Sequence, residues 1–200
     1  MFVIPSRQAP EQQRVACLNW PREYPYAPDV RFSIWHDGPV LHLSFQVQEE
    51  STRALQDRSG GFVYEDSCVE FFIQPDASDP HYYNFEWNAG GTLYLARRTS
   101  RFDPEEAPAE VLAQVKAVSS LGPAPFAEKH VEGPWTLDIA IPVSALWYED
   151  LKTWSGMHAR ANLYKCGDGL KVPHYLTWAP IEAPAPDYHR PEFFVPVEFA

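Results

Sequence analysis

Three segments of the chain place aromatic rings beside polar side chains. Residues 64–72 read YEDSCVEFF, residues 82–88 read YYNFEWN, and residues 176–178 read LTW. Sugar recognition requires this mixture, because the apolar C–H faces of a pyranose ring stack on aromatic side chains and its hydroxyl groups need planar polar groups at the ring edge. The three segments are therefore candidates for a saccharide-binding site.

The segment 82–88 alternates in a way that is typical of a strand. Successive side chains of a strand point to opposite faces, so Tyr83, Phe85 and Trp87 share one face. The opposite face carries mostly polar residues, namely Tyr82, Asn84, Glu86 and Asn88. We expect the aromatic face to lie in the core and the polar face to be able to contact a ligand.

Glu70 is the only charged residue on its face of the segment 68–73. Cys68 and Phe72 share that face, and the opposite face is entirely apolar. Burying a carboxylate among apolar neighbours is costly unless it is paired. Glu70 therefore has either a structural partner, such as an arginine or a backbone group, or a ligand, and the sequence leaves both alternatives open.

Glu70 and Glu86 also raise the alternative of a glycoside hydrolase, which uses two carboxyl groups. Such an enzyme needs a deep cleft that raises the pKa of one carboxyl group, whereas a sandwich of this size is expected to offer a shallow site at its rim. No GxSxG motif indicates a serine nucleophile. We favour a non-catalytic binding module over the enzyme, and a protein-interaction domain remains a third alternative.

The elements that position these residues are predicted to be strands. Strict alternation over residues 41–48 predicts a half-buried strand, and Asp37-Gly38 predicts a hairpin turn from the preceding strand. The same reasoning gives nine strands, over residues 30–35, 41–48, 67–74, 82–88, 92–96, 135–141, 159–165, 175–178 and 193–199.

The composition agrees with a chain built from strands. Its 200 residues include 20 Pro, 10 Gly and 29 aromatic residues, and amphipathic helical stretches are nearly absent. Many short strands separated by turn signals indicate two packed sheets. We predict an all-β, jelly-roll-like sandwich of two antiparallel sheets with about nine or ten strands and minimal helix, forming a single domain over residues 1–200.

The charge of the chain argues against two classes of partner. The formal net charge is −11, and the longest basic cluster is Arg97-Arg98, so nucleic acid and anionic membranes are poor partners. No segment approaches the roughly 18 to 20 apolar residues of a membrane span. The first five residues lack the apolar region of a secretory signal, which makes the cytoplasm the default expectation. The oligomeric state cannot be predicted from these features.

The order of several segments resembles the family 9 carbohydrate-binding modules and their free-standing relatives. The likeness runs through residues 64–72, 83–88, 135–142 and 162–199, and it covers the chain from about Val15 onward. Its most specific part is the Asp-Ser-x-Val-Glu pattern at 66–70. The resemblance implies a β-sandwich that holds a terminal sugar between two aromatic side chains, with hydrogen bonds from polar residues of adjoining strands.

The resemblance also implies roles for individual residues. Tyr64 stands at the position of the first stacking aromatic, six residues before Glu70, which matches the sugar-binding glutamate. Trp178 matches the second aromatic. A tyrosine in place of an indole at position 64 reduces the stacking area and bears on affinity or preference.

The polar part of the implied site comes from a neighbouring strand and from arginines. Asn84 and Glu86 lie on the strand whose outward positions line the pocket in the family. The arginines that contact sugar have no unambiguous match, and Arg98 and Arg190 are the candidates that we carry forward. The implied ligand is a mono- or oligosaccharide, such as the chain end of a xylan or a glucan.

The sequence indicates no cofactor and no metal site. Cys17, Cys68 and Cys166 form no CxxC motif, and we expect them to be free thiols. His174, Asp187 and His189 lie close in sequence but lack the spacing of HxH or HExxH. Relatives often hold structural calcium, but no DxDxDG-type loop is present, so calcium is left open.

Overall fold

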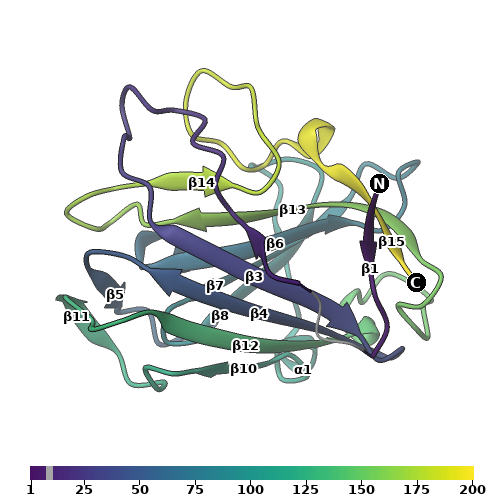
Figure 1. Ribbon diagram of the computed structural model, residues 1–200. Coiled ribbons are helices and arrows are strands. Elements are labelled where there is room, and N and C mark those ends of the chain that lie inside the picture. Colours follow the sequence, from purple (N-terminus) through teal and green to yellow (C-terminus); the bar gives the residue numbers. More distant parts are fainter. Residues whose placement is uncertain (8–10) are drawn as a thin grey trace.

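The segments with the clearest alternation form the longest strands of the computed structural model, which describes residues 1–7 and 11–200 (Figure 1). The strands of this part of the chain are β1 (Phe2–Ile4), β2 (Gln13–Arg14), β3 (Asp29–His36), β4 (Val40–Gln48), β5 (Thr52–Ala54), β6 (Cys68–Gln74), β7 (Tyr82–Asn88), β8 (Leu93–Arg98), β9 (Glu105–Glu106), β10 (Lys116–Ser119), β11 (Phe126–Lys129), β12 (Trp135–Pro142), β13 (His158–Cys166), β14 (Tyr175–Thr177) and β15 (Val195–Phe199). The helical elements are α1 (Ala109–Leu112) and the 3-10 turns Val63–Glu65, Val143–Ala145 and Pro191–Phe193.

The strands form two large sheets that pack face to face (Figure 1). The eight-stranded sheet has the order β1-β15-β13-β6-β7-β8-β9, and β14 pairs with β13. The five-stranded sheet has the order β10-β12-β4-β3-β2, and β5 and β11 form a small third sheet. Every pairing within the two large sheets is antiparallel except that of β1 with β15.

Alternation along each strand builds the core between the two sheets. On β4, Leu41, Leu43, Phe45 and Val47 are buried, while the residues between them are half-buried. β12 pairs with β4 along its whole length and contributes a similar apolar row. The hairpin between β3 and β4 turns at Gly38, whose φ of 97° favours glycine. Apolar residues from the large sheet, including Val69, Phe71 and Phe85, complete this core.

The large sheet is buried on both faces at its centre. Every residue of β6 and β7 is buried. Beyond the inter-sheet core, a second apolar cluster covers the outer face of the sheet, and it includes Trp20, Phe72, Tyr82 and Tyr188. This second cluster borders the candidate site and places the even-numbered residues of β6 and β7 in a buried environment.

The structure confirms the predicted antiparallel β-sandwich with little helix. All nine predicted segments contain strands, and β1, β2, β5, β9, β10 and β11 are additional. These six have two to four residues each, too few for a period of two to stand out. None of the described helices is long and apolar enough to cross a membrane.

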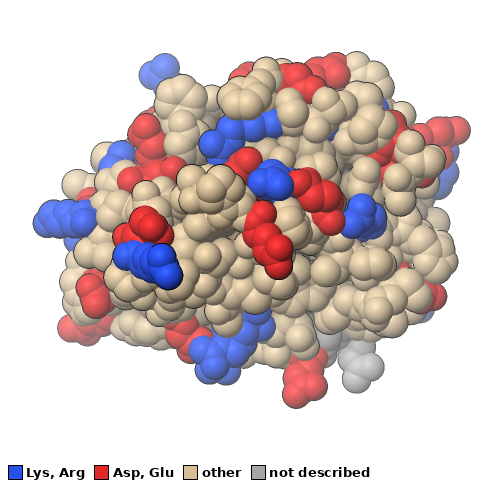
Figure 2. Space-filling model, turned by 90° about the horizontal axis from the view of Figure 1, so that it is seen from above, with Lys and Arg blue, Asp and Glu red and all other residues tan. Residues whose placement is uncertain are grey.

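Acidic and basic side chains are interspersed over the face that Figure 2 shows. The excess of acidic residues, which gives the net charge of −11, therefore does not form a single negative field on that face.

Candidate functional site

A cavity of about 460 Å³ lies on the outer side of the large sheet. Glu70 of β6, Glu86 of β7 and Arg98 of β8 line it, so three neighbouring strands contribute to its wall. The loops that follow β8 and β13 and the C-terminal segment around Tyr188 close the other sides. A cavity of this volume is within the range that holds small organic ligands.

Two buried carboxyl groups lie directly opposite each other in the cavity wall. Glu70 and Glu86 are paired residues in the β6–β7 ladder, and they are 3% and 5% exposed. Cys166 Sγ donates to Glu70 Oε1 over 3.1 Å, and Asn84 Nδ2 donates to Glu86 Oε1 over 2.7 Å. Neither carboxylate forms an ion pair within 4.0 Å in the described part of the chain.

The environment of this pair favours the protonated carboxyl group. Burial, and then the negative charge of Glu86, raise the pKa of Glu70 well above its ordinary value. Burial raises the pKa of Glu86 to about 7, although the hydrogen bond from Asn84 and the charge of Arg98 oppose this increase. The pair therefore retains a proton near neutral pH, so it offers both a hydrogen-bond donor and an acceptor.

Arg98 reaches Glu86 through an amide rather than directly. Arg98 Nε donates to Asn84 Oδ1 over 2.8 Å, and the Asn84 amide nitrogen donates to Glu86. Arg98 also donates to the Tyr94 hydroxyl (3.0 Å) and to the backbone oxygen of Arg101 (3.0 Å). These bonds hold the guanidinium group in one orientation at the cavity wall.

Aromatic rings line the cavity on more than one side. Tyr64, in the turn Val63–Glu65, is 38% exposed, and its ring lies 5.7 Å from that of Phe62. Tyr175 of β14 also lines the cavity and packs edge-on against Tyr24 at 4.7 Å. Tyr94 of β8 adds a further ring. The cavity thus combines apolar ring surfaces with carboxyl and guanidinium groups.

Comparison with known protein families assigns the chain to one of them. The sequence model for carbohydrate-binding family 9 matches residues 4–199. The chain belongs to carbohydrate-binding family 9. This confirms the resemblance inferred from the Asp-Ser-x-Val-Glu pattern. No curated protein matches the chain.

Solved structures with the same fold include other family 9 proteins. A candidate carbohydrate-binding protein from Bacteroides uniformis ATCC 8492 is 36% identical, with a TM-score of 0.93, and the match covers 100% of this chain and 98% of that one. A family 9 module from Caldicellulosiruptor kristjanssonii in complex with glucose is 12% identical, with a TM-score of 0.57, and the match covers 98% of this chain and 94% of that one. A family 9 module from the same organism in complex with cellotriose is 11% identical, with a TM-score of 0.56, and the match covers 98% of this chain and 92% of that one. At this low identity the two modules support the fold alone.

In this family 9 protein, Trp178 does not line the cavity. Its ring packs edge-on against Phe2 at 5.0 Å and Phe32 at 5.8 Å, next to the inter-sheet core. The reason is alternation after β14, because Trp178 has the same parity as Leu176, which lies in that core. The structure therefore does not bring Trp178 and Tyr64, the two aromatic residues predicted to stack on the sugar, to the same cavity. Tyr175, one residue before Leu176, lines the cavity instead.

Arg190 also lies outside the set of residues that line the cavity. Its Nε donates to Glu192 Oε1 over 2.7 Å, and its guanidinium group stacks on Phe193. The structure therefore does not bring Arg190 to the other candidates. Arg101, which the sequence analysis did not select, lines the cavity and pairs with Asp187 at 3.1 Å.

The remaining predicted residues are brought together. Glu70, Glu86, Arg98 and Tyr64 line the cavity, whereas Asn84 is fully buried behind its wall and bridges Arg98 and Glu86. Tyr175 was missed although the alternation of residues 175–178 contained a usable signal, since only one of Tyr175 and Trp178 can share a face with Leu176. Arg101 lies in a loop after β8, where no periodic pattern indicates direction.

Proposed function

We propose that this protein is a non-catalytic carbohydrate-binding protein that holds a saccharide in the cavity beside Glu70 and Glu86. The observation that carries the proposal is a buried pair of carboxyl groups that has no ion pair within 4.0 Å among the described residues and lies in a cavity that Tyr64 and Tyr175 also line. Each carboxyl group accepts one hydrogen bond from a described side chain, which leaves hydrogen-bonding capacity for a polar ligand.

The chemistry of the wall matches that of a sugar hydroxyl, which both donates and accepts hydrogen bonds. The protonated carboxyl group of the pair donates, the ionised one accepts, and Arg98 donates. The tyrosine rings offer flat apolar surfaces for the C–H face of a pyranose. The family 9 modules of C. kristjanssonii are in complex with glucose and cellotriose, which supports a glucose-type sugar as the ligand.

The charge of the cavity favours a neutral sugar over an acidic one. Five carboxyl side chains and two guanidinium groups line it. An anionic uronic acid would add a negative charge to a wall whose carboxyl groups already disfavour ionisation. We therefore place xylose- and glucose-type sugars before uronic acids.

Isothermal titration calorimetry with glucose, xylose, cellobiose, xylobiose and glucuronic acid tests the proposal. We expect dissociation constants from about micromolar to millimolar, roughly −8 to −4 kcal/mol, for a neutral sugar, and at least about tenfold weaker binding of glucuronic acid. Tyr64→Ala and Glu70→Gln should weaken binding, whereas Tyr148→Ala, a change at an exposed ring outside the cavity, should not. The absence of heat with every sugar would contradict the proposal.

A glycoside hydrolase is the second candidate, and the position of Glu70 directly opposite Glu86 in the cavity wall is the observation that favours it. Glycosidases need one carboxyl group protonated and one ionised at the working pH. The test is turnover of a panel of chromogenic glycosides by the wild type and by Glu70→Gln. If the wild type turns over a glycoside and the folded Glu70→Gln variant does not, the protein is an enzyme rather than a binding module.

A further inference from the structure

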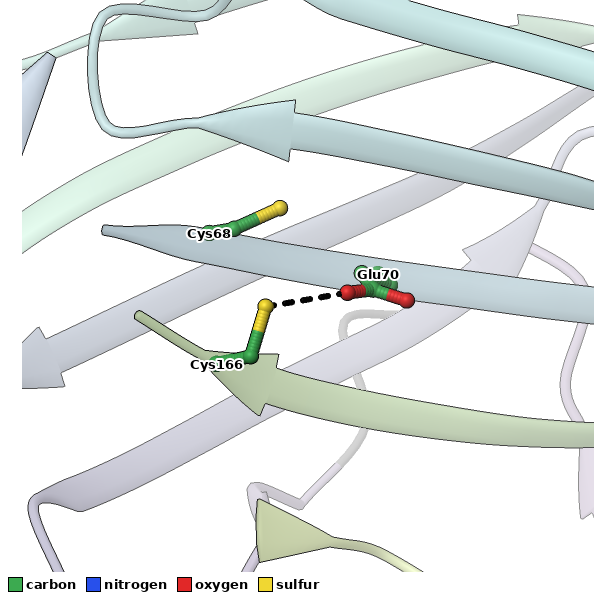
Figure 3. Close-up of side chains that lie close together, drawn as sticks. All are labelled: Cys68, Glu70 and Cys166. Atoms are coloured by element: carbon green, nitrogen blue, oxygen red, sulfur yellow. Dashed lines mark hydrogen bonds between the residues drawn. The ribbon is translucent and has the colours of Figure 1, made fainter. Parts of the chain in front are cut away.

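Two cysteines and a glutamate meet where β6 and β13 lie side by side (Figure 3). Cys68 and Cys166 are directly paired in the β6–β13 ladder, and Glu70 follows Cys68 by two residues on the same face. One ligand atom from each residue lies within 4.8 Å of the others, and Cys166 Sγ is 3.1 Å from Glu70 Oε1. Antiparallel pairing thus gathers three potential metal ligands into one group.

The group is buried but borders the cavity. Cys68 and Cys166 are 0% and 2% exposed, and both cysteines are free thiols. Cys166 and Glu70 line the cavity, so an ion held between the three side chains would have one side open toward it. Three protein ligands with an open fourth position form a common arrangement for zinc.

The donor set suits a cation of intermediate softness. Thiolate sulfur favours Zn²⁺ and its spectroscopic substitutes Co²⁺ and Cd²⁺ over Ca²⁺ and Mg²⁺, which prefer oxygen ligands. A carboxylate completes mixed sites of this type. Two sulfurs and one carboxylate therefore select against the calcium that the sequence analysis left open.

Metal binding requires the two thiols to release their protons. Burial opposes this release, because it raises the pKa of Cys68 to about 12 and the pKa of Cys166 well above its ordinary value. The geometry and the donor set of the group, and not the acidity of its thiols, therefore favour a cation.

We propose that Cys68, Glu70 and Cys166 form a binding site for a single zinc-type divalent cation, with its open coordination position toward the cavity. This proposal does not depend on saccharide binding. The backbone of two paired strands positions all three ligands, which limits the rearrangement that binding requires.

The test is cobalt titration of the reduced, metal-free protein. We expect one Co²⁺ per chain with a thiolate-to-cobalt charge-transfer band in the near ultraviolet, and loss of this band when one equivalent of Zn²⁺ is added. The variants Cys166→Ser and Glu70→Gln should bind Co²⁺ at least about tenfold more weakly. Cys17→Ser is the matched control, because Cys17 lies outside the group and its loss should leave the band unchanged.

Several results would overturn the proposal. One is the absence of a charge-transfer band in the wild type. Another is a band of unchanged intensity in the folded double variant Cys68→Ala/Cys166→Ala. Circular dichroism of each variant establishes that it is folded, and Glu70→Gln, which leaves both cysteines in place, provides a second measurement if a cysteine variant fails to fold.

Discussion

Two groups of buried charged side chains lie on opposite faces of the large sheet, and their charges are compensated in different ways. On the inner face, Lys165 Nζ lies 2.8 Å from Glu49 Oε2 and 2.6 Å from His174 Nε2, and it donates to the backbone oxygen of Cys166. Glu49 Oε1 accepts a hydrogen bond from Trp135 Nε1 over 2.8 Å. On the outer face, Glu70 and Glu86 have hydrogen-bond donors, but neither forms an ion pair within 4.0 Å with the residues that the structure describes.

The difference shows that burial of a charge does not by itself mark a functional site. Burial and the charge of Lys165 lower the pKa of His174 to about 3, so this imidazole is neutral and its Nε2 accepts a hydrogen bond from the lysine. The inner group is complete within the protein and excluded from solvent, with Lys165 fully buried. The outer pair is incomplete and lines a cavity, and this combination is what favours ligand binding.

Breaking the inner group should have the largest effect on stability. Lys165→Met leaves the Glu49 carboxylate buried without its cation, and we expect a loss of about 3–5 kcal/mol in the free energy of unfolding. Urea denaturation measures this loss. The double variant Lys165→Met/Glu49→Gln should recover part of it, because glutamine keeps an acceptor for Trp135. A loss below about 1 kcal/mol in the single variant would remove the distinction between the two groups.

Trp178 and Tyr175 allow a comparison, within one short segment, between a residue that stabilises the fold and a residue that lines the cavity. Trp178→Ala removes a half-buried ring that packs on Phe2 and Phe32, so we expect a loss of about 2–4 kcal/mol in stability with unchanged sugar affinity. Tyr175→Ala should weaken sugar binding at least about tenfold, because its ring lines the cavity. Chemical denaturation and calorimetry measure the two effects, and an affinity loss in Trp178→Ala alone would reverse the assignment of the faces.

The outer pair should contribute to the pH dependence of stability. The folded protein holds the Glu86 proton up to a pKa of about 7, whereas the unfolded chain releases it near the ordinary value of 4.5. At Glu86 the native state therefore binds more protons between these values, so the contribution of this group to the free energy of unfolding should fall as the pH rises from 5 to 7, by at most about 1.4 kcal/mol per pH unit. His174 and His189, whose pKa values burial lowers, contribute in the opposite direction over part of this range. Glu86→Gln keeps an acceptor for Asn84 and should remove this contribution, so the difference in the free energy of unfolding between the wild type and the variant should change with pH. Urea denaturation of both proteins at pH 5 and pH 7.5 measures the effect. The same change in the free energy of unfolding between the two pH values in both proteins would contradict the assignment.

Arg190→Ala should have the smallest effect. Its ion pair with Glu192 is partly exposed, and it lies outside the cavity. We expect a change within about 0.5 kcal/mol in stability and no change in sugar affinity. A clear loss of sugar affinity would show that Arg190 belongs to the binding site.

Much of the fold and part of the site were predictable from neighbouring residues. Alternation placed Phe85 and Trp87 in the inter-sheet core and Glu86 on the opposite face, and the structure confirms this separation. The same period places Cys68, Glu70 and Phe72 together on the outer face of β6. Loops and the C-terminal segment border the cavity over this face, and their positions could not be predicted from a local pattern.

What the sequence by itself determined was therefore the period of each strand, since side-chain direction in an extended chain depends only on adjacent residues. The tertiary structure alone decided which strands became neighbours, and so which distant side chains met. Cys166 lies 96 residues from Glu70, and Lys165 meets Glu49 across the sandwich. Such meetings depend on register and on packing between sheets, which no local pattern encodes. For the same reason Tyr175, rather than Trp178, became the ring of the C-terminal third that lies beside the carboxyl pair.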